Sequence, residues 1–166
     1  MFLQKAKFFL FSIIISAAMI SCSEENTNEP EQEFAATDSD FLGWTSWTKV
    51  AEKSGPDPAL GEAHSGNDAT VKRIIYIKDN AARGSNGQYP VGTRVVKETR
   101  DKDGNIMMIT AMAKRGGSFN SAHNGWEWFV IENNRISARG ENLMDGMCNG
   151  CHSGAKSTGD YVFSKK

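Results

Sequence analysis

Residues 93–113 read TRVVKETRDKDGNIMMITAMA, and this stretch decides the fold. The hydrophobic period over this part of the chain is two, which is the period of strands with a buried face, from Thr93 to Arg100 and again from Ile106 to Ala113. The tetrapeptide DKDG at residues 101–104 lies between them and carries the Asp-Gly signal of a tight hairpin turn. The stretch therefore predicts two antiparallel strands joined by a hairpin.

Three further stretches carry strand signals. Residues 71–77 read VKRIIYI and are rich in β-branched side chains. Residues 126–132 and 135–138 flank the tight turn Asn133-Asn134 and are also expected to be strands. Residues 79–89 contain two glycines and two asparagines, so we expect a loop, or a short helix with a loop, at that point.

A helical pattern precedes the strands. Five apolar residues recur at helical spacing and predict a helix with one buried stripe: Phe41, Trp44, Trp47, Val50 and Ala51. Residues 38–40 offer an N-terminal cap, and the Gly-Pro-Asp-Pro breaker at residues 55–58 should end the helix by Ser54. A second short helix is expected near the C-terminus. The fold class is therefore predicted to be α+β, mainly an antiparallel β-sheet with flanking helices.

Residues 148–152 read Cys-Asn-Gly-Cys-His, the attachment pattern of c-type haem. Each thiol can add to one vinyl group of the porphyrin, and the imidazole of His152 can then bind the iron from one side. A redox dithiol, a disulfide and half of a zinc site share the cysteine spacing, although a zinc ribbon needs a second cysteine pair that this sequence lacks. We predict one covalent haem c at a short C-terminal helix, held by Cys148 and Cys151, with His152 as the metal ligand.

The N-terminus has the features of an export signal. Basic residues precede an apolar run from Phe8 to Ile20, which is too short to span a bilayer as a helix. Cys22 follows directly after a serine, and this arrangement resembles a bacterial lipobox, in which the cysteine is lipidated; ordinary cleavage nearby is the alternative. We expect residues 1–21 to be a lipoprotein signal peptide, 22–38 an acidic flexible tether, and 39–166 the haem domain.

Cysteine and charge counts limit the function classes. The chain has three cysteines, so lipidation of Cys22 and haem attachment leave none for a structural disulfide. The formal net charge of −1 gives no basic footprint for nucleic acid, and we expect contact with the membrane only through the lipid anchor. The length suits a single domain with its own core.

Several ordered segments match a known family. They are RIIYI (73–77), YPVGTRVVKE (89–98), MAKR (112–115), GWEW (125–128) and DYVF (160–163), together with His64 and the haem motif. In this combination the chain resembles the cytochrome P-460 family, which includes cytochrome c′-beta. The resemblance implies a mostly antiparallel β fold, one haem near the C-terminus, a histidine-ligated iron that is open on its other side, and commonly a homodimer.

The resemblance also suggests a role for one lysine. Members similar to cytochrome P-460 proper carry a lysine bonded to the porphyrin edge and oxidise hydroxylamine, whereas those similar to cytochrome c′-beta lack this bond and bind nitric oxide. Lys97 occupies the lysine of the family's Val-Lys-Glu segment, so it is the candidate catalytic residue and the candidate for a haem cross-link. On a strand it points away from Val96 and Glu98. An ordinary exposed or ion-paired strand lysine is the alternative.

Other residues of this chain have a candidate role and a simpler one. Glu98 and Glu127 are candidate proton carriers, but are expected on solvated strand faces. His64 and His123 are candidate second axial ligands, with structural hydrogen bonds as the simpler role.

The same choice applies to two groups of apolar side chains. Five methionines could bind iron opposite the histidine, although packing is their commoner use: Met107, Met108, Met112, Met144 and Met147. Three phenylalanines could cap the distal side, although the core is the simpler position: Phe119, Phe129 and Phe163.

Together these features predict an exported haem protein that is lipid-anchored in the bacterial cell envelope and faces the periplasm. Its iron is expected to be five-coordinate and to bind or oxidise nitric oxide or hydroxylamine. If Lys97 modifies the porphyrin, the protein is expected to pass electrons to a partner cytochrome. The alternative is a six-coordinate electron-transfer cytochrome with no substrate chemistry.

Overall fold

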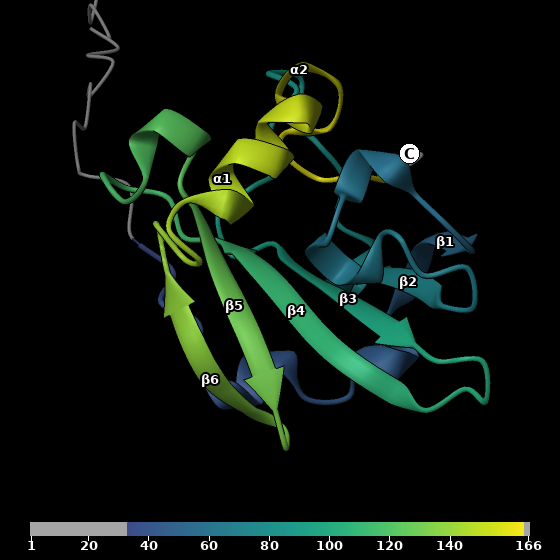
Figure 1. Ribbon diagram of the computed structural model, residues 1–166. Helices are drawn as coiled ribbons and strands as arrows, with labels where there is room; N and C mark the ends of the chain where they lie inside the picture. The colour runs from purple at the N-terminus through teal and green to yellow at the C-terminus, as the bar shows by residue number, and fades with distance from the viewer. Residues whose placement is uncertain (1–32, 165–166) are drawn as a thin grey trace, which may run out of the picture.

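A computed structural model describes residues 33–164 and contains one six-stranded sheet. The strands follow chain order across the sheet and every neighbouring pair is antiparallel (Figure 1). They are β1 (Thr48–Ser54), β2 (Lys72–Ile77), β3 (Arg94–Arg100), β4 (Ile106–Lys114), β5 (Trp126–Glu132) and β6 (Arg135–Gly140). The predicted antiparallel sheet is confirmed, with strand ends that differ from expectation by at most two residues for β2 to β6.

The hairpin between β3 and β4 forms as the sequence predicts. Asp101 makes the turn, because its Oδ1 accepts hydrogen bonds from the backbone N–H groups of Asp103 (2.9 Å) and Asn105 (2.8 Å). Gly104 has a φ of +86°, a left-handed conformation that glycine adopts without steric cost. The register then pairs Lys97 with Thr110 across the two strands.

Short helical segments fill the connections between strands. The α-helices are α1 (Met147–His152) and α2 (Lys156–Gly159), joined by the 3₁₀ turn η7 (Ser153–Ala155). The other 3₁₀ turns are η1 (Asp38–Phe41), η2 (Trp44–Ser46), η3 (Pro58–Leu60), η4 (Ala63–Ser65), η5 (Lys78–Asn80) and η6 (Ser121–His123). The predicted short helix near the C-terminus is therefore present, and the chain has the α+β composition expected.

The helix expected from Phe41 to Ala51 is wrong. This stretch forms η1 and η2 and then enters β1, which pairs with β2. Gly43 interrupts the helix with a φ of +67°, and an isolated helix of this length would be marginal in water. Pairing with the edge of the sheet supplies backbone hydrogen bonds that the helix would otherwise have made internally, so tertiary contact overrides the helical spacing.

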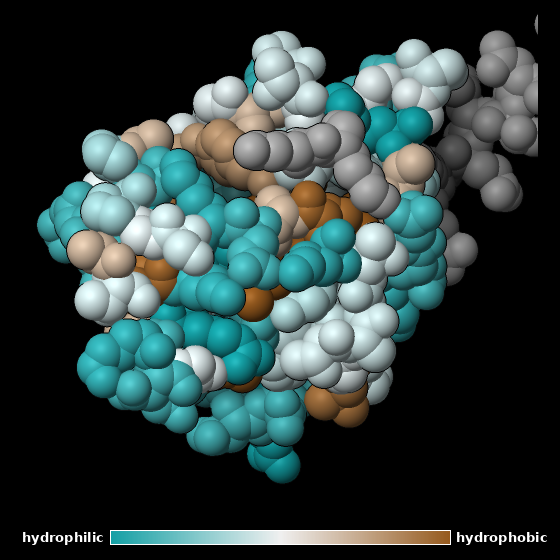
Figure 2. Space-filling model, turned by 90° about the vertical axis from the view of Figure 1, so that its right-hand side faces the viewer, coloured by the Kyte–Doolittle hydropathy of each residue, from teal (hydrophilic) through white to brown (hydrophobic). Residues whose placement is uncertain are grey.

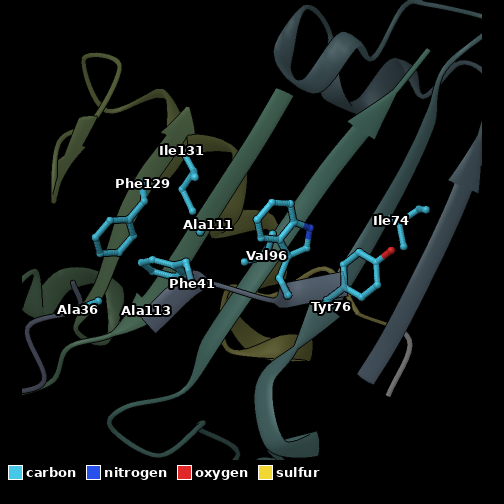
Figure 3. Close-up of a cluster of buried hydrophobic side chains, with 10 residues drawn as sticks. Ala36, Phe41, Ile74, Tyr76, Val96, Ala111, Ala113, Phe129 and Ile131 are labelled. Atoms are coloured by element: carbon cyan, nitrogen blue, oxygen red, sulfur yellow. The ribbon is translucent and has the colours of Figure 1, made fainter. Parts of the chain in front are cut away.

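Each face of the sheet carries its own buried cluster. The N-terminal cluster includes Phe41 and Trp44 from the 3₁₀ turns and Tyr76, Val96 and Phe129 from the strands (Figure 3). Within it, the rings of Phe41 and Phe129 lie 4.9 Å apart between centroids. Burying a side chain of this size contributes about 1.5–3 kcal/mol, so the 3₁₀ turns are held mainly by these aromatic contacts.

The C-terminal cluster lies on the opposite face of the sheet. It contains Val95, Met112, Trp126 and Trp128 from the strands and Tyr161 from the chain after α2. Figure 1 shows α1 and α2 on one side of the sheet and the N-terminal turns on the other. Because successive side chains of a strand point to opposite faces, β3 contributes Val95 to this cluster and Val96 to the other.

Two carboxylates expected on solvated strand faces are buried. Glu98 is 0% exposed and accepts hydrogen bonds from Trp44 Nε1 (3.2 Å), Tyr76 Oη (2.9 Å) and the guanidinium of Arg100 (2.7 Å). Glu127 is 2% exposed. The sequence-based expectation is wrong because a strand that lies between two buried clusters has no solvated face. The cost of burying each carboxylate is offset by an arginine and by hydrogen-bond partners.

The carboxylate of Glu127 is paired with an arginine in the same way. Arg139 Nε and Nη2 donate to it at 2.7 and 2.9 Å. Glu98 follows Lys97 on β3 and bonds to two members of the N-terminal cluster, so it lies on the face of the sheet opposite Lys97.

The described end of the expected tether contacts the sheet. The backbone N–H of Phe34 donates to the carbonyl of Arg115 (2.9 Å), Ala36 is buried, and Asp38 Oδ1 accepts from the backbone of Ile136 (2.8 Å). The surface drawn in Figure 2 is largely hydrophilic, with hydrophobic side chains gathered in small patches. Within residues 33–164 the helices are all too short or too polar to cross a membrane.

Candidate functional site

A cavity lies between helix α1 and the face of the sheet that carries the C-terminal cluster. Its volume is about 210 Å³, and it is partly open to solvent. Most of its lining is apolar and comes from Ile75, Val95, Met112 and Trp128 of the sheet and from Leu143 before α1. The cavity therefore offers an apolar ligand a site between the sheet and the C-terminal helices.

The predicted site residues meet in this cavity. Lys97 lines it from β3, and Cys148, Cys151 and His152 line it from α1, about fifty positions later in the chain. Side chains alternate along β3, so Lys97 lies on the same face of the sheet as Val95, which lines the cavity. The neighbouring strands place Ile75 and Thr110 opposite Lys97, and both also line the cavity. Cys22 lies outside the described residues.

A residue inside the haem motif attaches helix α1 to the sheet. Asn149 Oδ1 accepts a hydrogen bond from Trp128 Nε1 (2.7 Å) and another from Asn120 Nδ2 (3.2 Å). Asn149 Nδ2 donates to the carbonyl of Glu141 (2.7 Å). This role of Asn149 is not readable from the sequence, because nothing local to the motif shows that β5 supplies its hydrogen-bond partner.

The two thiols of the motif are not joined to each other. Cys148 is half-buried and Cys151 is exposed, and both are free. Burial raises the pKa of the Cys148 thiol, so this group stays protonated at neutral pH. Two free thiols on one turn of helix, both facing an apolar cavity, fit a porphyrin that each can join by adding to a vinyl group.

One ring nitrogen of His152 forms a hydrogen bond within the protein. Its Nδ1 lies 2.6 Å from the carbonyl oxygen of Tyr161, and because a carbonyl only accepts, Nδ1 carries the proton. The lone pair of the neutral ring is then on Nε2, as a metal ligand requires. The ring is packed between Trp128 (4.7 Å between centroids) and Phe163 (5.4 Å). Burial lowers the pKa of His152 to about 4, so the ring is neutral at pH 7.

Lys97 is only partly exposed and sits among apolar groups. Burial, followed by the nearby charge of Arg73, lowers its pKa to about 8 from the ordinary value of 10.5. At pH 7 the neutral amine of Lys97 is therefore more abundant than that of a solvated lysine. The expectation of an ordinary exposed lysine is therefore not met, and the side chain has the character of a nucleophile or a proton acceptor.

Comparison with known families identifies the family of the chain. The sequence model of the cytochrome P460 family matches residues 42–164, which is most of the chain and includes all six strands. The chain belongs to the cytochrome P460 family. It is accordingly a haem protein of the cytochrome class. No curated protein sequence matches the chain.

His64 is a polar residue that lines this cavity, and the sequence alone left its role open. It lies in η4 with a φ of +51°, followed by Ser65 at +54°, and both are left-handed conformations that side chains other than glycine rarely adopt. The buried Arg73 holds this turn, since its guanidinium donates to the carbonyls of Ser65 (3.4 Å) and Gly55. The turn thus keeps the imidazole of His64 against the cavity.

The imidazole of His64 lacks the structural hydrogen bond expected for it. Its Nδ1 is buried and has no hydrogen-bond partner among the described residues. Burial, followed by the charges of Lys97 and His152, lowers the pKa of His64 to about 3, so it stays neutral at physiological pH. His123 differs, because its Nδ1 bonds to Asn120 Oδ1 (2.9 Å) and it does not line the cavity. The structural role expected for His123 is therefore confirmed.

Most of the remaining apolar candidates line the cavity. Four of the five methionines line the cavity, Met108, Met112, Met144 and Met147, whereas Met107 does not. Phe163 lines the cavity and is 48% exposed. Phe129 lines it as well and also packs in the N-terminal cluster, whereas Phe119 stacks on Arg115. Glu98 and Glu127 do not line the cavity, so the proton-carrier role considered for them lacks structural support.

Proposed function

We propose that this P460 family member is an exported c-type haem protein with a single haem and an open axial position, which binds or oxidises small nitrogen species such as nitric oxide and hydroxylamine. His152 is the proposed iron ligand, and Cys148 and Cys151 the proposed attachment points. A haem held by these residues would supply a binding position for the nitrogen species and, for an oxidation, an acceptor for its electrons. The observation that carries the proposal is one apolar cavity lined by both cysteines and the histidine of the Cys-x-x-Cys-His motif and by Lys97.

The chemistry of attachment fits the free thiols. Each thiol adds across a vinyl double bond, so that a carbon–sulfur bond forms and the thiol proton moves to the other vinyl carbon. No oxidant is needed, because addition leaves the electron count of the pair unchanged. The spacing of Cys148 and Cys151 on α1 and the neutral Nε2 of His152 are the features that support this mode of binding.

The polar groups of the cavity support chemistry on a small ligand. The neutral imidazole of His64 is a hydrogen-bonding group for the ligand. Lys97, with a pKa lowered to about 8, is the proposed nucleophile for the bond to the porphyrin edge, because its neutral amine is more abundant than that of a solvated lysine. Electrons would pass to a partner cytochrome. If Lys97 is instead unbonded to the porphyrin and inert, the same cavity supports nitric oxide binding without turnover.

Optical spectra and peptide masses test the proposal together. The purified chain is examined in ferric and ferrous states, with and without nitric oxide, carbon monoxide and hydroxylamine. We expect a haem spectrum, ferrous binding of carbon monoxide, and tight nitric oxide binding. A red-displaced ferrous Soret band with loss of the intact peptide around Lys97 identifies the hydroxylamine-oxidising form, and an ordinary c-type spectrum identifies the nitric oxide-binding form. A colourless protein would disprove the proposal.

A six-coordinate electron-transfer cytochrome is the second candidate function. The observation that favours it is His64, whose buried Nδ1 has no partner among residues 33–164, together with four methionines in the cavity. A ferrous low-spin spectrum that carbon monoxide leaves unchanged would support this candidate and exclude the open site. In that event the variants His64→Ala and Met112→Ala identify the sixth ligand, because only loss of the true ligand restores carbon monoxide binding.

We also propose that the chain is lipid-anchored at Cys22 in the bacterial cell envelope and faces the periplasm. This proposal rests on the sequence of residues 1–22 alone. Membrane fractionation of the full chain and of Cys22→Ala tests it, since the variant should leave the membrane fraction while keeping its haem. A homodimer is proposed as well, and the sedimentation of the haem-loaded chain measures it.

A further inference from the structure

The turn that carries the partner of His152 is held in an unfavourable conformation. Asp160 and Tyr161 follow α2 and have φ values of +48° and +67°. A left-handed backbone costs a residue other than glycine about 1–3 kcal/mol, and it persists only where the surrounding contacts fix it. Two such residues in succession therefore indicate that strong contacts determine the direction of this backbone.

Those contacts converge on the carboxylate of Asp160. Its Oδ2 accepts from Lys114 Nζ and from the backbone N–H of Tyr89, both at 2.8 Å, and its Oδ1 accepts from Asn124 Nδ2 at 2.8 Å. The side chains of Lys114 and Asp160 are 4% and 1% exposed, so this is a buried ion pair. It joins the end of β4 to the turn after α2, which are far apart in sequence.

The next residue along the chain contacts the candidate iron ligand. The backbone N–H of Tyr161 donates to the carbonyl of Ala155 (3.1 Å) and its hydroxyl donates to the carbonyl of Ala122 (3.0 Å). The carbonyl of Tyr161 then accepts from Nδ1 of His152 at 2.6 Å. A rotation of the peptide after Asp160 would move this acceptor away from the imidazole.

We propose that Lys114 and Asp160 are positioning residues for the iron ligand, acting through the carbonyl of Tyr161. The buried pair fixes the left-handed turn, the turn aims the carbonyl at Nδ1, and the bond keeps the ring tautomer and orientation that expose Nε2 to the cavity. Neither residue of the pair lines the cavity. The inference rests on the proposed function only in taking His152 as the ligand.

A hydrogen bond to the free nitrogen of a ligating histidine makes the ring a stronger donor to its metal. A stronger donor favours ferric over ferrous iron, so loss of the bond raises the reduction potential. Loss of such outer partners changes metal affinity about 10–100-fold. A tenfold change in the ratio of ferric to ferrous affinity corresponds to about 59 mV for a one-electron couple. If Lys114 and Asp160 had only a structural role, their loss would lower the stability of the fold without changing the reduction potential or the strength of the iron–histidine bond.

The test uses the full haem-loaded chain and the variant Asp160→Asn, which keeps the shape of the side chain and removes its charge. The readouts are the reduction potential and the iron–histidine stretching frequency of the ferrous form. We expect a higher potential, by a shift equivalent to at least a tenfold change, and a lower stretching frequency. Glu98→Gln is the matched control, because Glu98 is equally buried in an ion pair on the opposite face of the sheet.

Two outcomes would overturn the inference. One is an Asp160→Asn protein with wild-type potential and stretching frequency, and the other is a Glu98→Gln control that moves both as much. If Asp160→Asn does not accumulate, Lys114→Arg and Lys114→Met replace it, and the arginine variant, which keeps the charge, must be closer to wild type in both readouts.

His152→Ala separates this inference from the proposed function. An unchanged haem spectrum in His152→Ala would mean that His152 is not the ligand, and the proposed function would fail with it. A changed spectrum in His152→Ala, combined with wild-type readouts in Asp160→Asn, would overturn the positioning role alone.

Discussion

His64 makes the stability of the protein depend on pH in a way that its replacement should remove. Its pKa is 6.5 in an ordinary setting and about 3 in the fold, because burial disfavours the imidazolium. Between these values the unfolded chain binds a proton that the folded chain does not. The contribution of His64 to the free energy of unfolding is therefore fully present above pH 6.5. It is lost as the pH falls toward 3, by up to about 1.4 kcal/mol per pH unit.

The magnitude over an accessible range follows from the same two pKa values. From pH 7 to pH 5 the His64 contribution falls by about 2 kcal/mol. Chemical denaturation of the haem-loaded chain, followed by circular dichroism at pH 7, 6 and 5, measures it. The wild type should lose about 2 kcal/mol more than His64→Gln over this range.

The neighbouring variant Ser65→Ala is the control, since it changes the same turn and retains the imidazole. Its free energy of unfolding should fall from pH 7 to pH 5 as much as that of the wild type. Between pH 7 and 8 the free energies of unfolding of all three proteins should change alike. Equal losses in the wild type and His64→Gln between pH 7 and 5 would refute the reasoning, because His64 would then be solvated in the fold.

Three further outcomes are expected. Replacing Cys148 or Cys151 singly by serine should leave haem covalently attached through the other thiol, and the double variant should lose the haem stain on a denaturing gel; stain in the double variant would exclude attachment at these residues. Asn149→Ala should destabilise the chain by about 1–3 kcal/mol, because Trp128 Nε1 loses its acceptor while buried; denaturation midpoints measure this, and an unchanged midpoint would contradict it. Glu98→Gln should cost about 2–3 kcal/mol, somewhat below a fully buried pair because its arginine partner is partly exposed; the haem spectrum should stay unchanged, and a spectral shift would show that the two faces of the sheet are coupled.

The sequence by itself determined the features that depend on neighbours along the chain. The β3–β4 hairpin follows from a period of two interrupted by Asp-Gly, and the short helix at residues 147–152 was expected from the segment that contains Cys-x-x-Cys-His. The grouping of the motif segments also predicted the family that the comparison shows. These features are readable because turn geometry and side-chain alternation are local properties of the backbone.

Only the tertiary structure decided the features that depend on distant partners. Residues 48–54 became a strand because β2 offered an edge, although their spacing is helical. Glu98 is buried because tryptophan, tyrosine and arginine side chains from separate segments satisfy its carboxylate. The pair of Lys114 with Asp160 and the contact of His64 with the cavity are of the same kind. A single sequence does not reveal such partners, because the free energy of burying a charged or titratable group is set by atoms that folding alone brings together.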